Sequence, residues 1–192
     1  MPEIDDQNEI ITSRIIFLGA AGAGKRTILK AMHNELSAPV KREIVRVTEH
    51  GKIFIAFDIV PLVLGRGRYR SRYRVQTLAE DQNVSDLPFA VLKRSDGIYF
   101  VADSSHSRAE MNLSYYERLK HEIASLEIPI IFQYNKRDLL NAMSTEDMDK
   151  QFAIDPSERF EVSATEGTGL LASLKAMTTR LDQRLNSRPN GT

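Results

Sequence analysis

The sequence predicts an α/β fold with a mostly parallel central sheet, one antiparallel hairpin, and helices on both faces. Stretches typical of strands and helices alternate along the 192 residues, which favours parallel strands joined by helical crossovers. The continuous apolar run 97–103 is typical of a central strand that is buried on both faces. The turn "LGRGR" at 64–68 lies between two extended stretches and favours an antiparallel hairpin.

The first half of the chain contains one expected helix among four extended stretches. The apolar segment 13–18 predicts the first strand, and a glycine-rich loop leads from it into a helix at about 26–36. Segments 43–50 and 52–62 are extended, and segment 68–78 is a strand by its alternation of side chains.

The second half continues the alternation of strands and helices. Segment 107–125 predicts a helix, 128–136 a central strand, 144–152 a short helix that begins at a Ser/Thr cap, and 159–165 a last strand. A closing helix follows. We expect one domain over 1–192, with its core at about 10–185. The expected inner face of helix 107–125 consists of Met111, Tyr115, Leu119 and Ile123. That of the closing helix consists of Leu170, Leu174, Met177 and Leu181.

Composition and charge exclude several classes of function. The chain has 26 Lys and Arg against 26 Asp and Glu, and this zero net charge argues against a general polyanion binder. The absence of cysteine excludes disulfides, thiolate zinc sites, cysteine nucleophiles and prenylation. The acidic N-terminus is unlike a secretory signal, Pro2 excludes myristoylation, and no apolar run is long enough to cross a bilayer. We therefore expect a cytoplasmic protein without membrane insertion.

A glycine-rich loop, "GAAGAGKRT" at 19–27, connects the first expected strand to the first expected helix. The pattern Gly-x-x-x-x-Gly-Lys-[Ser/Thr] binds phosphate, because glycines let backbone N–H groups approach the oxygens and the lysine adds positive charge. The N-terminus of the helix adds the positive end of its dipole. The expected phosphate-site residues are Gly19, Ala20, Gly22, Ala23, Gly24, Lys25, Arg26 and Thr27.

Arg26 occupies the position of the Ser/Thr hydroxyl that normally ligates Mg²⁺. Arginine is a permanent cation and cannot ligate a metal. Thr27 is rotated by roughly 100° around the helix, so we do not expect it to replace the hydroxyl. Two interpretations follow: Arg26 supplies positive charge in place of Mg²⁺, or it fills the site and the loop is a relic. We predict no metal ligand in this chain.

A second motif, "NKRD" at 135–138, directly follows an expected central strand and is typical of guanine recognition. The Asp138 carboxylate can accept from both N1–H and the exocyclic amine of guanine, a paired donor edge that adenine lacks. Asn135 can brace the loops and the base, and the Lys136 stem can cover the purine face. "SAT" at 163–165 follows the last expected strand, and its backbone can reach the base carbonyl. The expected base-site residues are Asn135, Lys136, Asp138, Ser163, Ala164 and Thr165.

With these motifs in this order, the chain resembles Ras-type small GTPases, and more narrowly the bacterial MglA family of gliding-motility polarity switches. The narrower resemblance lies in "FDIVPL" at 57–62, "GIYFVADS" at 97–104 and "FQYNKRDLLNA" at 132–142. It implies a Ras-like phosphate-loop G domain, GTP or GDP as ligand, and a cycle between membrane-pole and cytosolic states. The implied partners are roadblock-type activating proteins, response-regulator-type polarity proteins and TPR-type scaffolds.

The chain departs from this family where the family's catalytic and switch residues lie. The family has an Arg-Thr pair before its "FDF" strand, where Arg assists hydrolysis and Thr senses the γ-phosphate through Mg²⁺; here Ile53 and Phe54 hold those positions. The family's Thr-Val-Pro-Gly-Gln is replaced by "TLAEDQ", with Glu80 in place of Gly and Asp81 in place of Gln. A carboxylate at that place repels a triphosphate. Gln82 is one residue late, although a shifted loop could recruit it.

Three hypotheses follow from these departures. The leading one is a guanine-nucleotide-binding switch with very weak or absent hydrolysis, because loss of a catalytic arginine alone removes about 10³–10⁵ in rate. The alternatives are a nucleotide-free pseudoGTPase scaffold and an active GTPase with rearranged switch loops. In each case we expect a monomer that binds regulatory proteins rather than nucleic acid, with recruitment to a cell pole.

The arginine-rich segment 66–74 stands apart from these motifs. From Tyr69 onward, period-2 alternation puts the arginines on one strand face and Tyr69, Ser71, Tyr73 and Val75 on the other. It is open to three interpretations: a solvated edge strand protected by charge, a surface for an acidic protein, or a nucleic-acid contact, which the zero net charge disfavours. Asp58 and Asp103 lie at strand ends, where either faces the nucleotide or caps a loop. The arginines are Arg66, Arg68, Arg70, Arg72 and Arg74.

Overall fold

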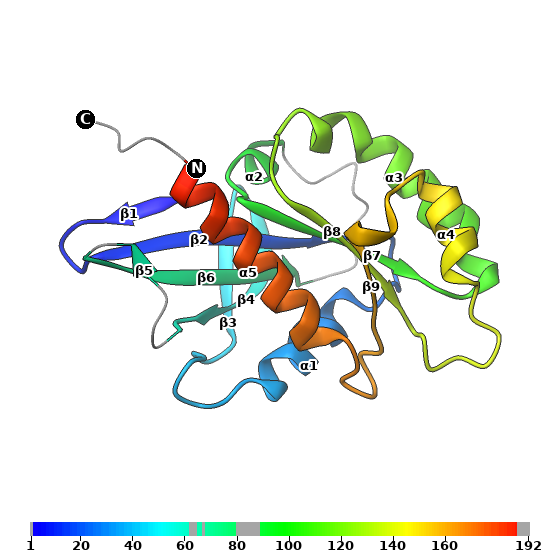
Figure 1. The fold of residues 1–192 in the computed structure, drawn as a ribbon, viewed down its shortest axis with the longest axis horizontal. Coiled ribbons are helices and arrows are strands. Elements are labelled where there is room, and N and C mark those ends of the chain that lie inside the picture. Colours follow the sequence, from blue (N-terminus) through cyan, green and yellow to red (C-terminus); the bar gives the residue numbers. More distant parts are fainter. Residues whose placement is uncertain (1, 62–64, 67, 80–88, 188–192) are drawn as a thin grey trace.

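The structure is a computed structural model that describes residues 2–61, 65–66, 68–79 and 89–187. Within these ranges the chain forms one sheet of nine strands, which run side by side through the middle of the molecule (Figure 1). In chain order the strands are β1 (Glu3–Asp5), β2 (Ile10–Leu18), β3 (Val45–Glu49), β4 (Lys52–Ile59), β5 (Gly65–Arg66), β6 (Tyr69–Leu78), β7 (Gly97–Asp103), β8 (Ile130–Asn135) and β9 (Arg159–Glu161).

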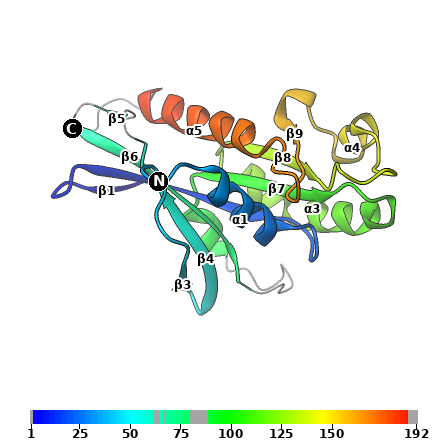
Figure 2. The ribbon, with the colours of Figure 1, turned by 90° about the horizontal axis from the view of Figure 1, so that it is seen from below.

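Helices cover both faces of the sheet. The helices are α1 (Lys25–Glu35), α2 (Phe89–Lys93), α3 (Ala109–Ala124), α4 (Thr145–Phe152) and α5 (Leu170–Ser187), with short 3₁₀ turns η2 (His106–Arg108) and η3 (Pro156–Glu158). Helices α1 and α5 pack on one face, and α2, α3 and α4 pack on the other. In Figure 2, α5 and α3 lie on opposite sides of β7. The expected Ser/Thr cap of α4 is Ser144, whose hydroxyl accepts from the Asp147 amide at 3.1 Å.

The strand order is β3-β4-β6-β2-β7-β8-β9, and the strands from β6 to β9 in this order are parallel to their neighbours. β4 is antiparallel to both β3 and β6. These pairings confirm the predicted fold class. They also add antiparallel pairs that the sequence did not predict, because β1 runs along β2 and β3 runs along β4.

The parallel strands bring three loops to one edge of the sheet. β2 pairs with β7, and β7 pairs with β8 in a register that sets Asp103 beside Asn135. Because parallel strands end at the same edge, the loops that follow β2, β7 and β8 lie together there. This edge is where open α/β sheets bind their ligands.

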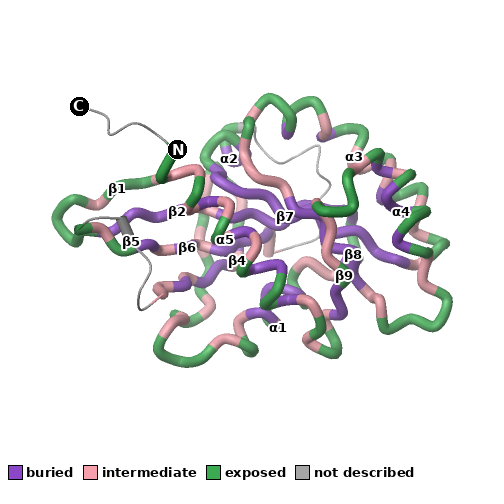
Figure 3. Tube along the Cα trace, in the orientation of Figure 1, coloured by how far each residue is buried: buried purple, intermediate pink, exposed green. Residues whose placement is uncertain are grey.

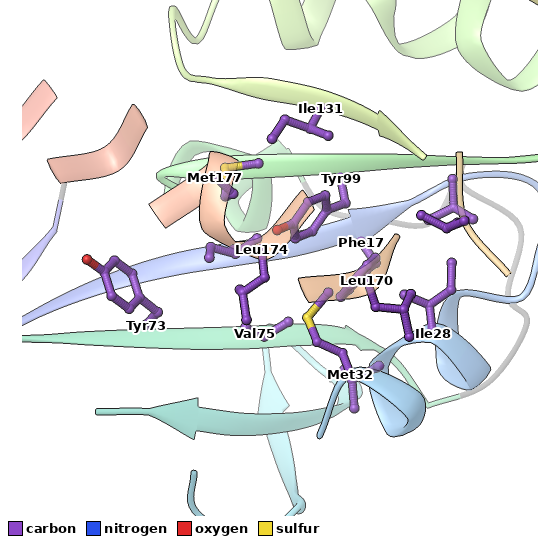
Figure 4. Packing of buried hydrophobic residues seen from close by; sticks show 14 of the residues in the cluster. Phe17, Ile28, Met32, Tyr73, Val75, Tyr99, Ile131, Leu170, Leu174 and Met177 are labelled. Carbon is purple, nitrogen blue, oxygen red and sulfur yellow. The ribbon is translucent and has the colours of Figure 1, made fainter. Parts of the chain in front are cut away.

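The first core lies between the sheet and helices α1 and α5. Ile28 and Met32 of α1 and Leu174 and Met177 of α5 are buried and point at the sheet (Figure 4). The predicted inner face of the closing helix is therefore confirmed, with all four of its apolar residues buried.

Two buried tyrosines attach α5 to the sheet. The Tyr73 hydroxyl donates to Oδ1 of Asp182 at 2.6 Å, and the Tyr99 hydroxyl donates to the Ser173 carbonyl at 3.1 Å. Burial raises the pKa of both tyrosines, so that both hydroxyls keep their protons at neutral pH. α5 is thereby held at a fixed position after the loop that contains Ser163.

The second core lies on the opposite face, between the sheet and α2, α3 and α4. β7 is buried along its whole length, as the continuous apolar run predicts (Figure 3). On α3 the predicted inner stripe is correct for Leu119 and Ile123, which are buried. It is wrong for Met111, which is 44% exposed, because the buried side chain in the first turn of α3 is Asn112, which donates to the Asp103 carbonyl at 2.8 Å.

The edge-strand interpretation of the arginine-rich segment is wrong. β6 is an interior strand between β4 and β2, although its alternation is confirmed, with Ser71 and Tyr73 buried. Arg74 donates two hydrogen bonds to Asp58 of β4, at 2.8 and 3.0 Å. Alternation fixes the two faces of a strand but not its neighbours, and here a neighbouring strand supplies the carboxylate. The side chain of Arg66 lies outside the described residues.

Candidate functional site

The glycine-rich loop, residues 19–24, leads from β2 into α1 as the sequence predicts. Gly19 and Gly24 both have positive φ, at 142° and 94°. A Cβ at Gly19 would collide with the Val101 carbonyl oxygen, and a Cβ at Gly24 would collide with the Asn135 amide. These close approaches require glycine at both positions and pack the loop against the ends of β7 and β8.

Lys25 is the first residue of α1 and its side chain folds back over the loop. Its ammonium group donates to the Gly19 carbonyl at 2.8 Å and to the Ala20 carbonyl at 2.7 Å. The positive charge is therefore held against the first two residues of the loop. A point charge held there suits an anion bound by the loop's backbone amides.

Arg26, the next residue of α1, reaches across to the end of β6. Its Nη1 donates to the Ala79 carbonyl at 2.7 Å, so one guanidinium joins the glycine-rich loop to the segment that follows β6. Thr27 is exposed on α1. A guanidinium has no lone pair for a metal, so the residue present at this position does not fit Mg²⁺.

Among residues 2–61, 65–66, 68–79 and 89–187 there is no group of three or more His, Asp or Glu side chains that could hold a metal ion. Asp58, one of the two carboxylates at strand ends, pairs with Arg74 on the sheet. The sequence-predicted positions Glu80, Asp81 and Gln82 lie outside the described residues.

Asn135 connects the loops that follow β2 and β9. Its Nδ2 donates to the Ala23 carbonyl at 2.8 Å, and its Oδ1 accepts from the Ala164 amide at 3.2 Å. The side chain is 2% exposed, so both hydrogen bonds are made away from water. The amide of Asn135 thus fixes the glycine-rich loop relative to the "SAT" segment.

Asp138 and Ser163 form the other half of this connection. The Ser163 hydroxyl donates to Oδ1 of Asp138 at 2.7 Å and lies 2.9 Å from the Thr165 hydroxyl oxygen. The hydrogen bond from Ser163 lowers the pKa of Asp138, which keeps its exposed carboxylate ionised at neutral pH. An ionised, exposed carboxylate beside the loop can accept two hydrogen bonds from a ligand such as guanine.

Lys136 has positive φ, at 67°, and its ammonium group donates to Oδ2 of Asp103 at 2.5 Å. Asp103 is 1% exposed, and its Oδ1 accepts from the amide and hydroxyl of Ser105. Burial raises the pKa of Asp103, but the hydrogen bonds from Lys136 and Ser105 outweigh it and the net pKa is lowered. Asp103 therefore positions Lys136 and caps its own loop.

The structure brings the predicted phosphate-site and base-site residues together at one edge of the sheet. The sequence did not predict two contacts at this site. Arg26 donates to the Ala79 carbonyl, and the Arg108 guanidinium lies against the loop at Gly22. The available signal was that Arg108 follows the end of β7, at the same sheet edge as the motifs. The chemistry of the assembled groups suits an anion at the loop and a paired donor edge at Asp138.

Comparison with known proteins agrees with this geometry. The chain is 31% identical over 183 residues to the mutual gliding-motility protein MglA of Myxococcus xanthus (strain DK1622), covering 92% of this chain and 94% of the relative. No protein-family model matches the chain. Among the described residues, no helix combines the length and apolar character that a membrane crossing needs.

Proposed function

The chain belongs to the MglA family of small GTPases, and on this premise we propose that it is a guanine-nucleotide-binding switch with very weak or absent GTP hydrolysis. Its ligands are GDP and GTP. The glycine-rich loop with Lys25 holds the phosphates, and Asp138 with the "SAT" segment holds the base. The Ser163–Asp138 hydrogen bond at 2.7 Å supports this assignment, because it orients an ionised carboxylate for the donor edge of guanine.

Arg26 is the observation that carries the proposal. It stands at the place of a Mg²⁺-ligating hydroxyl, and its guanidinium is engaged with the Ala79 carbonyl at 2.7 Å. A cation at about 4 Å from a phosphate oxygen contributes on the order of 4 kcal/mol at an effective dielectric near 20, and Mg²⁺ carries twice that charge. Nucleotide binding is therefore independent of Mg²⁺, with weaker affinity for the triphosphate than a metal-dependent site provides.

Weak hydrolysis follows from the residues on β4. Ile53 and Phe54 hold the positions of the family's Arg-Thr pair, and neither side chain can stabilise charge or ligate a metal. Phe54 is fully buried in the core under α2 and α3, so the sheet itself uses this position for packing. Loss of an arginine that neutralises transition-state charge costs about 10³–10⁵ in rate.

The proposed cellular role rests on the similarity to a gliding-motility protein. We place the chain in the control of cell polarity and motility, as a cytoplasmic protein recruited to a cell pole. Its partners are roadblock-type or response-regulator-type regulatory proteins, with TPR-type scaffolds as a further class. A protein that hydrolyses little GTP stays in one signalling state until its nucleotide exchanges. Such partners therefore recognise which nucleotide is bound and do not respond to GTP hydrolysis.

The first experiment determines which nucleotide the protein binds. Purified protein is denatured, the released nucleotide is identified by chromatography, and stripped protein is titrated with GDP, GTP and ADP. Co-purified guanine nucleotide and binding of GDP but not ADP are expected. Binding of no nucleotide contradicts the proposal and favours the nucleotide-free scaffold, for which the internal hydrogen bonds of Lys25 to Gly19 and Ala20 are the supporting observation.

Turnover separates the proposal from an active enzyme. Phosphate release from GTP is measured with the purified chain, alone and with a candidate activating protein. We expect no release above that of an Asp138→Ala variant under the same conditions. Rapid release by the chain alone contradicts the proposed loss of hydrolysis and favours an active GTPase with rearranged switch loops.

A further inference from the structure

We propose that Arg108 binds the diphosphate of the guanine nucleotide and supplies, together with Arg26, the positive charge that Mg²⁺ supplies elsewhere. The inference deepens the proposed function and rests on it. Arg108 ends the 3₁₀ turn η2, just before α3, and its amide donates to the Ser105 carbonyl at 2.9 Å. The turn therefore fixes the backbone of Arg108 at the sheet edge where the glycine-rich loop lies.

The guanidinium of Arg108 lies against the glycine-rich loop at Gly22. Its Nη2 is 3.1 Å and its Cζ is 3.8 Å from the position that a Cβ on Gly22 would occupy. Gly22 is exposed and has a φ of 77°, so the loop presents bare backbone on this side. A permanent cation is thus placed directly beside the backbone that approaches phosphate.

The charged groups around Arg108 do not neutralise its positive charge, so its guanidinium can bind an anion. The nearest carboxylate in the described part of the chain is Asp103, whose Oδ2 is 4.0 Å from Nε of Arg108. That same oxygen already accepts from Lys136 at 2.5 Å, so two cations share one buried carboxylate and the trio has a net charge of +1. The guanidinium also donates a hydrogen bond from Nη1 to Sδ of Met111 at 3.2 Å, and a thioether is a weak acceptor.

The position of Arg108 points to phosphate rather than to the base. It touches the loop at Gly22, whereas the base-recognition carboxylate Asp138 is engaged with Ser163. A guanidinium offers five N–H donors in a planar fork that matches two oxygens of a phosphate group. The side chain of Arg108 is 39% exposed, so a ligand can reach it. Arg26 and Arg108 together carry two positive charges, the same charge as one Mg²⁺ ion.

The test compares Arg108→Met with Arg118→Met, which removes the same charge from an exposed position on α3. A fluorescent GDP is bound to stripped protein in EDTA, and GDP and inorganic pyrophosphate are used as competitors. Urea midpoints of the nucleotide-free variants check that both are folded. We expect Arg108→Met to lower the affinities for GDP and for pyrophosphate by similar factors of roughly 10 to 100. We expect Arg118→Met to change either affinity by less than about twofold.

Each other result overturns the inference in a different way. If Arg108→Met leaves both competitors unchanged, Arg108 does not bind the diphosphate. If the affinity for GDP falls and the affinity for pyrophosphate does not, Arg108 acts on the base or on the fold. A lower urea midpoint with equal losses in Arg108→Lys, which keeps the charge, indicates a structural role. Absence of GDP binding by the wild-type chain overturns the proposed function itself, and this inference with it.

Discussion

The Arg26 guanidinium donates a hydrogen bond to the Ala79 carbonyl at 2.7 Å and so joins the first turn of α1 to the end of β6. These residues are 53 positions apart in the chain. In a Mg²⁺-dependent site of this type the corresponding hydroxyl is a metal ligand. Here the same position makes a contact within the protein. Under the proposed function, the arginine replaces both the charge of the ion and its connection to the end of β6.

The first prediction concerns base selectivity at Asp138. In Asp138→Asn the amide keeps one acceptor but presents an N–H₂ group where the carboxylate accepted from the guanine amine. We expect GDP affinity to fall by roughly 10- to 100-fold, because a hydrogen bond to a charged group is worth about 1.5–3 kcal/mol. Xanthosine diphosphate has a carbonyl in place of that amine, so the variant binds it better than the wild type does. Competition against fluorescent GDP measures both. An Asp138→Asn variant that still prefers GDP as strongly as the wild type contradicts the assignment.

The second prediction concerns the buried carboxylate of Asp103 and pH. Its folded-state pKa lies below the ordinary 3.8, so its contribution to stability is present above that value and is lost as pH falls through the folded pKa. Asp103→Asn removes the partner of Lys136, and we expect it to lower the free energy of unfolding by about 1.5–3 kcal/mol at pH 7.

The difference between wild type and Asp103→Asn begins to shrink as pH falls below about 4, where the carboxyl group of the unfolded chain takes up a proton, and it is lost only below the lowered pKa of the folded state. Urea unfolding at pH 7 and at pH 3.5 measures it. Glu117→Gln, which breaks an exposed ion pair with Lys120 on α3, is the control and changes stability by less than about 1 kcal/mol. A difference between wild type and Asp103→Asn that stays constant with pH shows that the charge of Asp103 is not what stabilises the loop.

The third prediction concerns the attachment of α5. Asp182→Ala leaves the buried Tyr73 hydroxyl without its acceptor, and an unsatisfied buried donor costs about 1–3 kcal/mol. Tyr73→Phe removes the hydroxyl itself and leaves Asp182 partly exposed to water, so its cost is smaller. The double variant therefore resembles Tyr73→Phe rather than the sum of the two changes. Urea unfolding of the three variants decides this, and strictly additive losses mean that the hydrogen bond contributes no coupling.

The fold and both motif regions were predictable from the sequence because each has a local signal. The period of apolar residues marks the strands and α5, and the spacing of Gly19, Gly24 and Lys25 marks the loop. Parallel strands then bring the ends of β2, β7 and β8 to one edge, so Asn135 meets Ala23 across 112 residues. Consecutive strand–helix units make that long-range meeting a consequence of topology.

What the sequence could not give was the neighbour of each strand and the reach of long side chains. Arg72 and Arg74 of β6 pair with Asp58 because β4 lies beside β6, and alternation alone is equally compatible with an edge strand. The contact of Arg26 with Ala79 and that of Arg108 with Gly22 depend on flexible side chains that cross between elements. Such contacts have no periodic signature in the sequence.

The central claim, that an arginine has taken the place of Mg²⁺, is tested most directly by the GDP affinity of the stripped protein in Mg²⁺ and in EDTA. Arg26→Ser restores the hydroxyl, and Lys30→Ser, at an exposed position of α1, controls for the lower helix propensity of serine. For the wild type and for Lys30→Ser, we expect the GDP affinities in Mg²⁺ and in EDTA to agree within about twofold. For Arg26→Ser, we expect the affinity in Mg²⁺ to exceed that in EDTA by a factor of roughly ten or more, which corresponds to at least about 1.4 kcal/mol. Wild-type binding that weakens by roughly tenfold or more in EDTA contradicts the claim.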